Sequence, residues 1–262
     1  MTDKKTFRTN WWANLNNTWK AILYNSYKYE NYVHLLSYLE NSSLIPNLSN
    51  EEIEEIEKIE YVFYNNDPCD GHYENEYERL NNLNNLTECN FYFNNSNLLE
   101  LSVENNNISS INFLNNFPSL ELVKLDYNNI SEIPKLKLKQ IKQLNIGCNK
   151  ITDVTNIGSL STLEELSLYN NKIQSLNGFE ALVNLKTLSI FGNTISDLHP
   201  LSKLKRLQKL VLDNNKITDL SPISNLTELI ILSVTTNNYS NSKNVISTLK
   251  NLYNLNKLER LY

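Results

Sequence analysis

From residue 98 onward the chain repeats one pattern of apolar and polar positions. Residues 163–173 read L-E-E-L-S-L-Y-N-N-K-I, with leucine at positions one, four and six, asparagine at position nine and isoleucine at position eleven. The same frame begins at Leu98, Leu120, Ile141, Leu163, Leu185, Leu207 and Leu229, so successive frames start 21 or 22 residues apart. A fixed period of this length predicts a solenoid in which each repeat stacks on its neighbours.

Each class of residue has a physical role in this frame. Apolar residues at positions four and six alternate with other residues, which predicts a short strand with one buried face, and stacked parallel strands roughly 4.8 Å apart can bury that face. The chain then turns away from the strand and leaves backbone N–H and C=O groups in the interior. We predict that the ninth-position asparagines satisfy these groups, because an amide offers both a donor and an acceptor. They are Asn106, Asn128, Asn149, Asn171, Asn193, Asn215 and Asn237.

This frame resembles the leucine-rich repeat family, in particular its short class of about 22 residues, which includes bacterial internalins and the leucine-rich regulatory subunit of a protein phosphatase. The resemblance covers about residues 98–262. It implies an α/β repeat fold with a curved parallel β-sheet on the concave face and short helical or 3-10 turns on the convex face. The sequences D-L-H-P-L at 197–201 and D-L-S-P-I at 219–223 are candidates for such turns. The frequent Asn, Lys, Ile and Tyr suggest an AT-rich genome. We expect a bacterial source.

The residues before the regular repeats follow other patterns. Apolar residues recur near every third or fourth position between residues 11 and 23, so we expect residues 1–55 to form an α-helical cap over the open end of the solenoid. Ser49 and Glu52 fit a capping box at the start of a short helix. We assign residues 56–97 to degenerate first repeats, with a strand near Tyr61–Phe63 in which Tyr61 occupies position four and Asn66 position nine.

Two segments interrupt the regular spacing. Residues 86–97 form either a truncated repeat or an edge hairpin with the strand that follows them. Near the end of the chain, leucines spaced by three match those of an earlier repeat and predict that Leu261 begins a last strand, after a repeat lengthened to 29 residues. The regular repeats, which follow the cap and the degenerate first repeats, therefore extend over residues 98–262.

Charge and cysteine content narrow the class of protein. The chain has 24 Lys and Arg against 29 Asp and Glu, a formal net charge of −5, which disfavours a nucleic-acid binder because such proteins need a basic face. The three cysteines are odd in number and irregularly spaced, so we expect reduced thiols. The N-terminal segment has no apolar h-region, and no apolar stretch reaches about twenty residues. We expect a cytoplasmic protein without a membrane segment.

The sequence contains no motif that predicts catalysis. None of the three histidines lies in a nucleophile elbow or an H-E-x-x-H helix, and none of the five glycines forms a phosphate-binding loop. Cys69, Asp70 and His72 are close together but lack the second ligand pair that a zinc site needs. We therefore expect no enzymatic activity, no cofactor and no metal.

The concave face is the predicted binding surface, because positions three, five and seven flank the buried leucines and point outward. Tyr169 and Phe191 occupy position seven in adjacent repeats and should form one aromatic patch, with Tyr127 at its edge and a recess beside it at Gly147. The predicted charged rim consists of Lys124, Asp126, Glu165, Lys209 and Asp213. Aromatic residues beside small ones, rimmed by charge, are typical of a protein interface.

These observations predict a non-enzymatic module that binds another protein through its concave face. A more specific function within this class is that of an immunity-type or regulatory inhibitor that neutralises a toxin or an enzyme. Two different functions also fit the pattern, an internalin-like surface adhesin and a sensor that stacks a small ligand on the aromatic patch. The sequence does not identify the partner.

Overall fold

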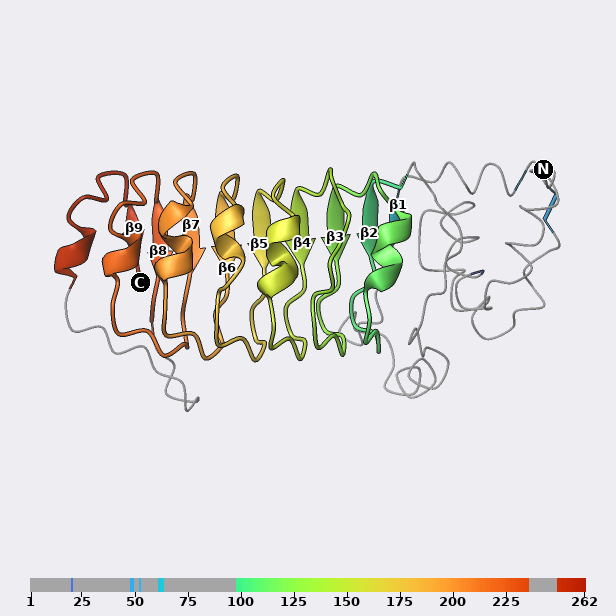
Figure 1. Cartoon of the computed structure of the whole chain (residues 1–262), viewed down its shortest axis with the longest axis horizontal. Coiled ribbons are helices and arrows are strands. Elements are labelled where there is room, and N and C mark those ends of the chain that lie inside the picture. Colours follow the sequence, from blue (N-terminus) through green and yellow to red (C-terminus); the bar gives the residue numbers. More distant parts are fainter. Residues whose placement is uncertain (1–19, 21–47, 50–51, 53–60, 64–97, 236–248) are drawn as a thin grey trace, which may run out of the picture.

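The computed structural model describes residues 20, 48–49, 52, 61–63, 98–235 and 249–262. It contains one sheet of nine parallel strands that follow one another in chain order, β1 to β9 (Figure 1). The strands are β1 (Tyr61–Phe63), β2 (Glu100–Ser102), β3 (Leu122–Lys124), β4 (Gln143–Asn145), β5 (Glu165–Ser167), β6 (Thr187–Ser189), β7 (Lys209–Val211), β8 (Ile231–Ser233) and β9 (Arg260–Leu261). The predicted parallel solenoid is therefore confirmed.

The register of the sheet is the register of the sequence frame. Leu144 pairs with Leu166, and Leu166 pairs with Leu188, so position four of one repeat lies beside position four of the next. Backbone hydrogen bonds continue beyond the short strands, as when the N–H of Leu168 donates to the carbonyl of Ser189 at 2.8 Å. This ladder holds adjacent repeats at a constant spacing and stacks equivalent side chains in columns.

The convex side consists of 3-10 helices, as the turn sequences predicted. They are η3 (Asn112–Asn116), η4 (Thr155–Ser159), η5 (Phe179–Ala181), η6 (His199–Lys203), η7 (Ser221–Ile223) and η8 (Lys250–Leu252). The repeat that begins at Leu120 instead crosses the convex side without a helix, over residues 131–138, and Pro134 lies within this segment. In Figure 1 the helices and the strands form two rows along the molecule that overlap in this view.

The core is a stack of similar apolar layers, one for each repeat. In the repeat that begins at Leu163 the buried side chains are Leu163, Leu166, Leu168, Ile173, Leu176, Phe179 and Leu182. Three come from the strand and its approach, and four come from the turn and the convex return. A repeat has no other way to cover these side chains, so its stability depends on its neighbours.

The structure also tests the expectations for the less regular segments. Residues 1–55 lie almost entirely outside the described residues, which leaves the α-helical cap a prediction. The capping box is confirmed, because the N–H of Glu52 donates to Ser49 Oγ at 3.2 Å and the N–H of Ser49 donates to Glu52 Oε2 at 2.9 Å. Strand β1 is also present, but Tyr61 pairs with Glu100, at position three. The predicted register of this strand was therefore wrong by one residue.

The structure bears differently on residues 86–97 and on the lengthened last repeat. Strand β2 is paired by β1 on one edge and β3 on the other, which leaves it no free edge for a hairpin with residues 86–97, and these residues lie outside the described ones. In the last repeat Leu261 pairs with Leu232, which confirms that the lengthened repeat returns to the frame. The strand begins at Arg260, one residue before the predicted start.

Candidate functional site

The concave face is formed by the side chains that alternate with the buried ones. In each strand from β3 to β8 the middle residue is buried and its two neighbours are partly or fully exposed. Of the predicted site residues, Tyr127, Glu165 and Lys209 are exposed, and Lys124, Tyr169, Phe191 and Asp213 are half-buried. Asp126 differs from all of these, because it is only 5 % exposed. Its assignment to the exposed rim was therefore wrong.

Three aromatic side chains form a cluster on this face. The rings of Tyr169 and Phe191 are stacked, with centroids 5.0 Å apart and planes inclined by 12°. Tyr127 meets Tyr169 edge to face, with centroids 6.5 Å apart and planes inclined by 73°. Both arrangements suit the electrostatics of aromatic rings. The predicted patch is present, and Tyr127, which is 53 % exposed, is its most accessible member.

Gly147 supports this cluster instead of forming a recess beside it. A Cβ atom at Gly147 would overlap the Tyr169 ring, so the ring occupies the space that a side chain at this position would fill. The ring thus leans from its own repeat over the preceding one. The predicted recess was wrong, since a glycine in a strand-like segment is often where another group approaches the backbone closely.

Asp126 lies on the other side of Gly147. Its Oδ1 accepts a hydrogen bond of 2.5 Å from the Gly147 N–H. The pKa of the Asp126 carboxyl is raised from 3.8 to about 7, chiefly by burial, which the hydrogen bond from Gly147 opposes and the nearby Glu104 carboxylate reinforces. Burial likewise raises the pKa of the Tyr169 hydroxyl, and the charge of Asp126 acts in the same direction. A buried carboxyl group with a raised pKa therefore lies two repeats before Tyr169, in the same column of side chains.

Asp213 occupies the corresponding position on the C-terminal side of the cluster, but its surroundings differ. It accepts hydrogen bonds from Ser233 Oγ at 2.8 Å and from the Thr235 N–H at 2.6 Å, and the Thr235 hydroxyl contacts the same oxygen. Its carboxylate is thus engaged by the following repeat. Through its Oδ1, Asp213 fixes the backbone of the following repeat beside the cluster.

The residues at position eight adopt a left-handed backbone conformation in the repeats that begin at Leu98 to Leu207. The backbone φ is positive at Asn105, Tyr127, Cys148, Asn170, Gly192 and Asn214. Asparagine and glycine tolerate this conformation, whereas for tyrosine and cysteine it costs about 1 kcal/mol. Tyr127 therefore occupies its place in the cluster at a local cost in backbone energy, and strain of this kind often occurs at functional sites.

The predicted asparagine ladder is confirmed for the described repeats. Asn171 Nδ2 donates to the carbonyls of Ile146, Leu168 and Tyr169 at 3.0–3.2 Å, and its Oδ1 accepts from the Ile151 N–H at 3.0 Å. Asn128, Asn149, Asn193 and Asn215 make equivalent bonds. Asn106 Nδ2 donates to the carbonyls of Val103 and Glu104 in its own repeat. Asn237 lies outside the described residues. The ladder holds the turns that carry the cluster.

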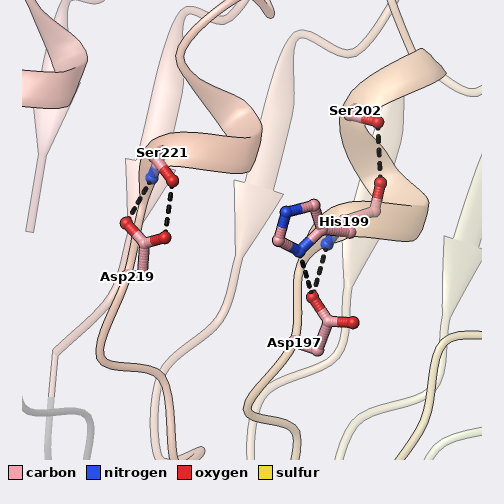
Figure 2. A network of polar contacts seen from close by, with 5 residues as sticks. All are labelled: Asp197, His199, Ser202, Asp219 and Ser221. Carbon is pink, nitrogen blue, oxygen red and sulfur yellow. Dashed lines mark hydrogen bonds and ion pairs between the residues drawn. The ribbon is translucent and has the colours of Figure 1, made fainter.

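On the convex side, aspartates that precede two of the 3-10 helices accept hydrogen bonds from the first residue of each helix. Figure 2 shows Asp197 with His199, whose backbone N–H and Nδ1 lie 2.9 and 2.6 Å from Asp197 Oδ1. One repeat later Asp219 accepts from the Ser221 N–H at 2.8 Å. These backbone hydrogen bonds lower the pKa of Asp197, and the Ser221 hydroxyl with its N–H lowers that of Asp219. The histidine, serine and aspartates drawn there are explained by local turn structure.

The described residues lack the features of two other kinds of site. No group of three or more histidine, cysteine, aspartate or glutamate side chains is placed to hold a metal ion in that part of the chain. Within the same residues, no helix combines the length and the apolar character needed to cross a membrane.

Known proteins provide an independent comparison. A family model described as Leucine Rich repeats (2 copies) matches residues 161–203. Internalin C2 from Listeria monocytogenes is 26% identical in sequence, with a TM-score of 0.64 over 92% of each chain. The functional domain of InlJ from Listeria monocytogenes, with 20% identity and a TM-score of 0.59 over 80% of this chain and 40% of that one, has the same fold.

A third similar structure, with a lower TM-score, is that of TLR13 in the TLR13–ssRNA13 complex. It is 27% identical, with a TM-score of 0.53 over 63% of this chain and 25% of its own. No curated protein sequence matches this chain. The repeat frame, the parallel register and the asparagine ladder agree with the matched family model and with the internalin fold. The chain is therefore similar to leucine-rich repeat proteins both in its repeat frame and in its fold.

Proposed function

We propose that this protein is a non-enzymatic module that recognises a partner protein through the concave face of the solenoid. The observation that carries the proposal is the exposed cluster of Tyr127, Tyr169 and Phe191, in which Tyr127 keeps a costly left-handed backbone. Rigid aromatic side chains bury a large area with little loss of conformational entropy, which is why they dominate binding hot spots. Leucine-rich repeat folds commonly serve protein–protein interaction, and solenoids use their concave surface for it.

A finer form of this proposal is an immunity-type or regulatory inhibitor. A stiff concave surface can block the active site of an enzyme or toxin without any chemistry of its own. The proposal includes a cytoplasmic location and a bacterial source, which cell fractionation and the identity of the partner would test. Recovery of a toxin or an enzyme whose activity falls on binding would support the inhibitor.

A second candidate is an internalin-like surface adhesin. The likeness to internalin C2 along 92% of both chains favours it. The two candidates predict different locations, because an adhesin lies outside the cell. Detection of the native protein in the culture medium or the cell envelope would favour the adhesin over the cytoplasmic module.

The TLR13 likeness raises single-stranded RNA as a ligand, since that structure is a complex with ssRNA13. A nucleic-acid site neutralises phosphates with lysine and arginine. This chain has a formal net charge of −5, and Asp126, Glu165 and Asp213 lie among its concave residues. We therefore propose a protein partner and use RNA as a negative control.

The test is affinity purification from the native cell with the full chain, followed by calorimetry with the recovered partner. The double variant Tyr169→Ala/Phe191→Ala should lose a few kcal/mol of binding free energy, because it removes the centre of the cluster. Its Tm should change little, since both side chains are half-buried. The matched control is Tyr253→Ala, which removes an exposed tyrosine near η8. Equal affinity of wild type and double variant would place the partner on another surface.

A further inference from the structure

The concave face carries more acidic than basic side chains around the aromatic cluster. In the repeats that begin at Leu98 to Leu229, positions three, five and seven hold five acidic residues and two lysines. They are Glu100, Glu104, Asp126, Glu165 and Asp213, against Lys124 and Lys209. A partner surface with an excess of positive charge complements this arrangement and is steered toward it.

The acidic residues differ in how far they are engaged. Asp213 already accepts bonds from the following repeat, and Asp126 is buried with its Oδ1 bound by the Gly147 N–H. Glu104 lies next to Asp126, close enough for its charge to raise the pKa of that carboxyl, and it is only half-buried. Its Oε2 accepts a bond of 3.1 Å from Ser102 Oγ, and its side chain also hydrogen-bonds the Asp126 carboxyl. A carboxylate has about four acceptor sites, so Glu104 keeps capacity to accept bonds from a ligand.

Tyr127 lies on the repeat that follows the one carrying Glu104. It follows Asp126 in the chain, and its carbonyl accepts a hydrogen bond from the Asn106 N–H of the repeat that carries Glu104. Its ring meets Tyr169 edge to face and is the most exposed of the cluster. An exposed aromatic face and a half-buried carboxylate therefore lie on neighbouring repeats. Lys124 is also near Asp126, so the site contains one positive charge among its acidic groups.

We infer, as a development of the proposed protein-binding function, that the partner presents an arginine whose guanidinium stacks on Tyr127 and donates to Glu104. A guanidinium is flat, weakly hydrated and always charged, so it can stack on a ring while its edge donates paired hydrogen bonds to a carboxylate. A lysine ammonium satisfies the charge but not the stacking. The site thus selects a basic segment and, within it, arginine.

The experiment titrates the full chain with short glycine–serine peptides, followed by amide NMR shifts. The peptides differ only in one central residue, which is arginine, lysine or the uncharged isostere citrulline. We expect the arginine peptide to shift resonances around Tyr127 and Gly147 and to bind about tenfold more tightly than the citrulline peptide. The lysine peptide should lie between them, and added salt should weaken binding of both charged peptides.

Two variants locate the site. Glu104→Gln and Tyr127→Asn should each weaken the arginine peptide by about threefold to tenfold. Glu132→Gln, which removes an exposed carboxylate outside the concave face, should leave its affinity unchanged. Equal affinity for the arginine and citrulline peptides, or no effect of Glu104→Gln, would overturn the inference.

The outcomes also separate this inference from the proposed function. A native partner that requires Tyr169 and Phe191 but is insensitive to Glu104→Gln would leave the protein-binding function intact and remove the arginine. Binding of a single-stranded RNA oligonucleotide that displaces the arginine peptide would contradict both, because a phosphate backbone is repelled by this acidic surface.

Discussion

Positions eight and nine of the repeat are neighbours in the chain and behave in opposite ways. Position nine is asparagine in every repeat from Leu98 to Leu229, and in the repeats that begin at Leu120 to Leu207 it is buried and bonded to the backbone of its own and the preceding repeat. Position eight is held in one backbone conformation, yet its side chain varies from glycine to tyrosine. At position nine, burial and hydrogen bonding determine which side chain is allowed. At position eight, the turn determines the backbone conformation but leaves the side chain free to vary. The solenoid therefore keeps its binding surface variable beside an invariant framework.

The largest expected difference between the two positions is in stability. Asn171→Ala should lower the free energy of unfolding by about 1–3 kcal/mol, because it leaves buried carbonyls and an N–H unpaired. Asn170→Gly is the matched control, since the next repeat has Gly192 at the same position and glycine tolerates the left-handed conformation. Urea unfolding measures both variants. Equal losses would contradict the distinction between a buried and an exposed asparagine.

The second prediction concerns the contact that positions the cluster. Gly147→Ala should cost about 2 kcal/mol, because the new methyl group overlaps the Tyr169 ring and forces it away. The same substitution in a Tyr169→Ala background should cost less than about 0.5 kcal/mol, since the ring is gone. A double-mutant cycle by urea unfolding gives the coupling energy. Additive effects would show that the ring does not lie over Gly147.

The buried carboxyl beneath the cluster should make stability depend on pH. Because the pKa of Asp126 is raised to about 7, the folded state binds a proton more tightly than the unfolded chain, and stability falls as pH rises from about 4 to 7. Asp126→Asn should remove this loss and be more stable than wild type by about 1 kcal/mol at pH 8. The difference between the two proteins should shrink at pH 5. A pH-independent difference would contradict the raised pKa.

The smallest expected effect isolates the cost of the backbone at Tyr127. Tyr127→Asn and Tyr127→Ala both remove the ring, but asparagine tolerates positive φ better than alanine. The asparagine variant should therefore be more stable by about 0.5–1 kcal/mol, while both variants bind the partner equally weakly. Thermal unfolding and calorimetry give the two readouts. Equal stability of the variants would mean that the left-handed conformation carries no cost here.

The repeat frame alone determined most of the solenoid. The spacing of Leu163, Leu166 and Leu168 predicted a buried strand, and the ninth-position asparagine predicted a donor and an acceptor inside the turn. Both predictions hold in the structure. They succeed because a repeat has one way to bury its apolar residues, so sequence spacing translates directly into columns of side chains. The aromatic cluster followed for the same reason, since Tyr169 and Phe191 share a column.

Only the tertiary structure decided how residues in neighbouring columns lean on one another. Asp126 has the spacing of an exposed residue, but it is buried, bound by the Gly147 N–H and close to Glu104, while the Tyr169 ring lies over Gly147. Sequence position defines where a Cα lies in a solenoid, whereas side-chain tilt depends on the space left by its neighbours. A glycine one repeat before a tyrosine in the same column was the available signal, because the missing Cβ leaves room for the ring.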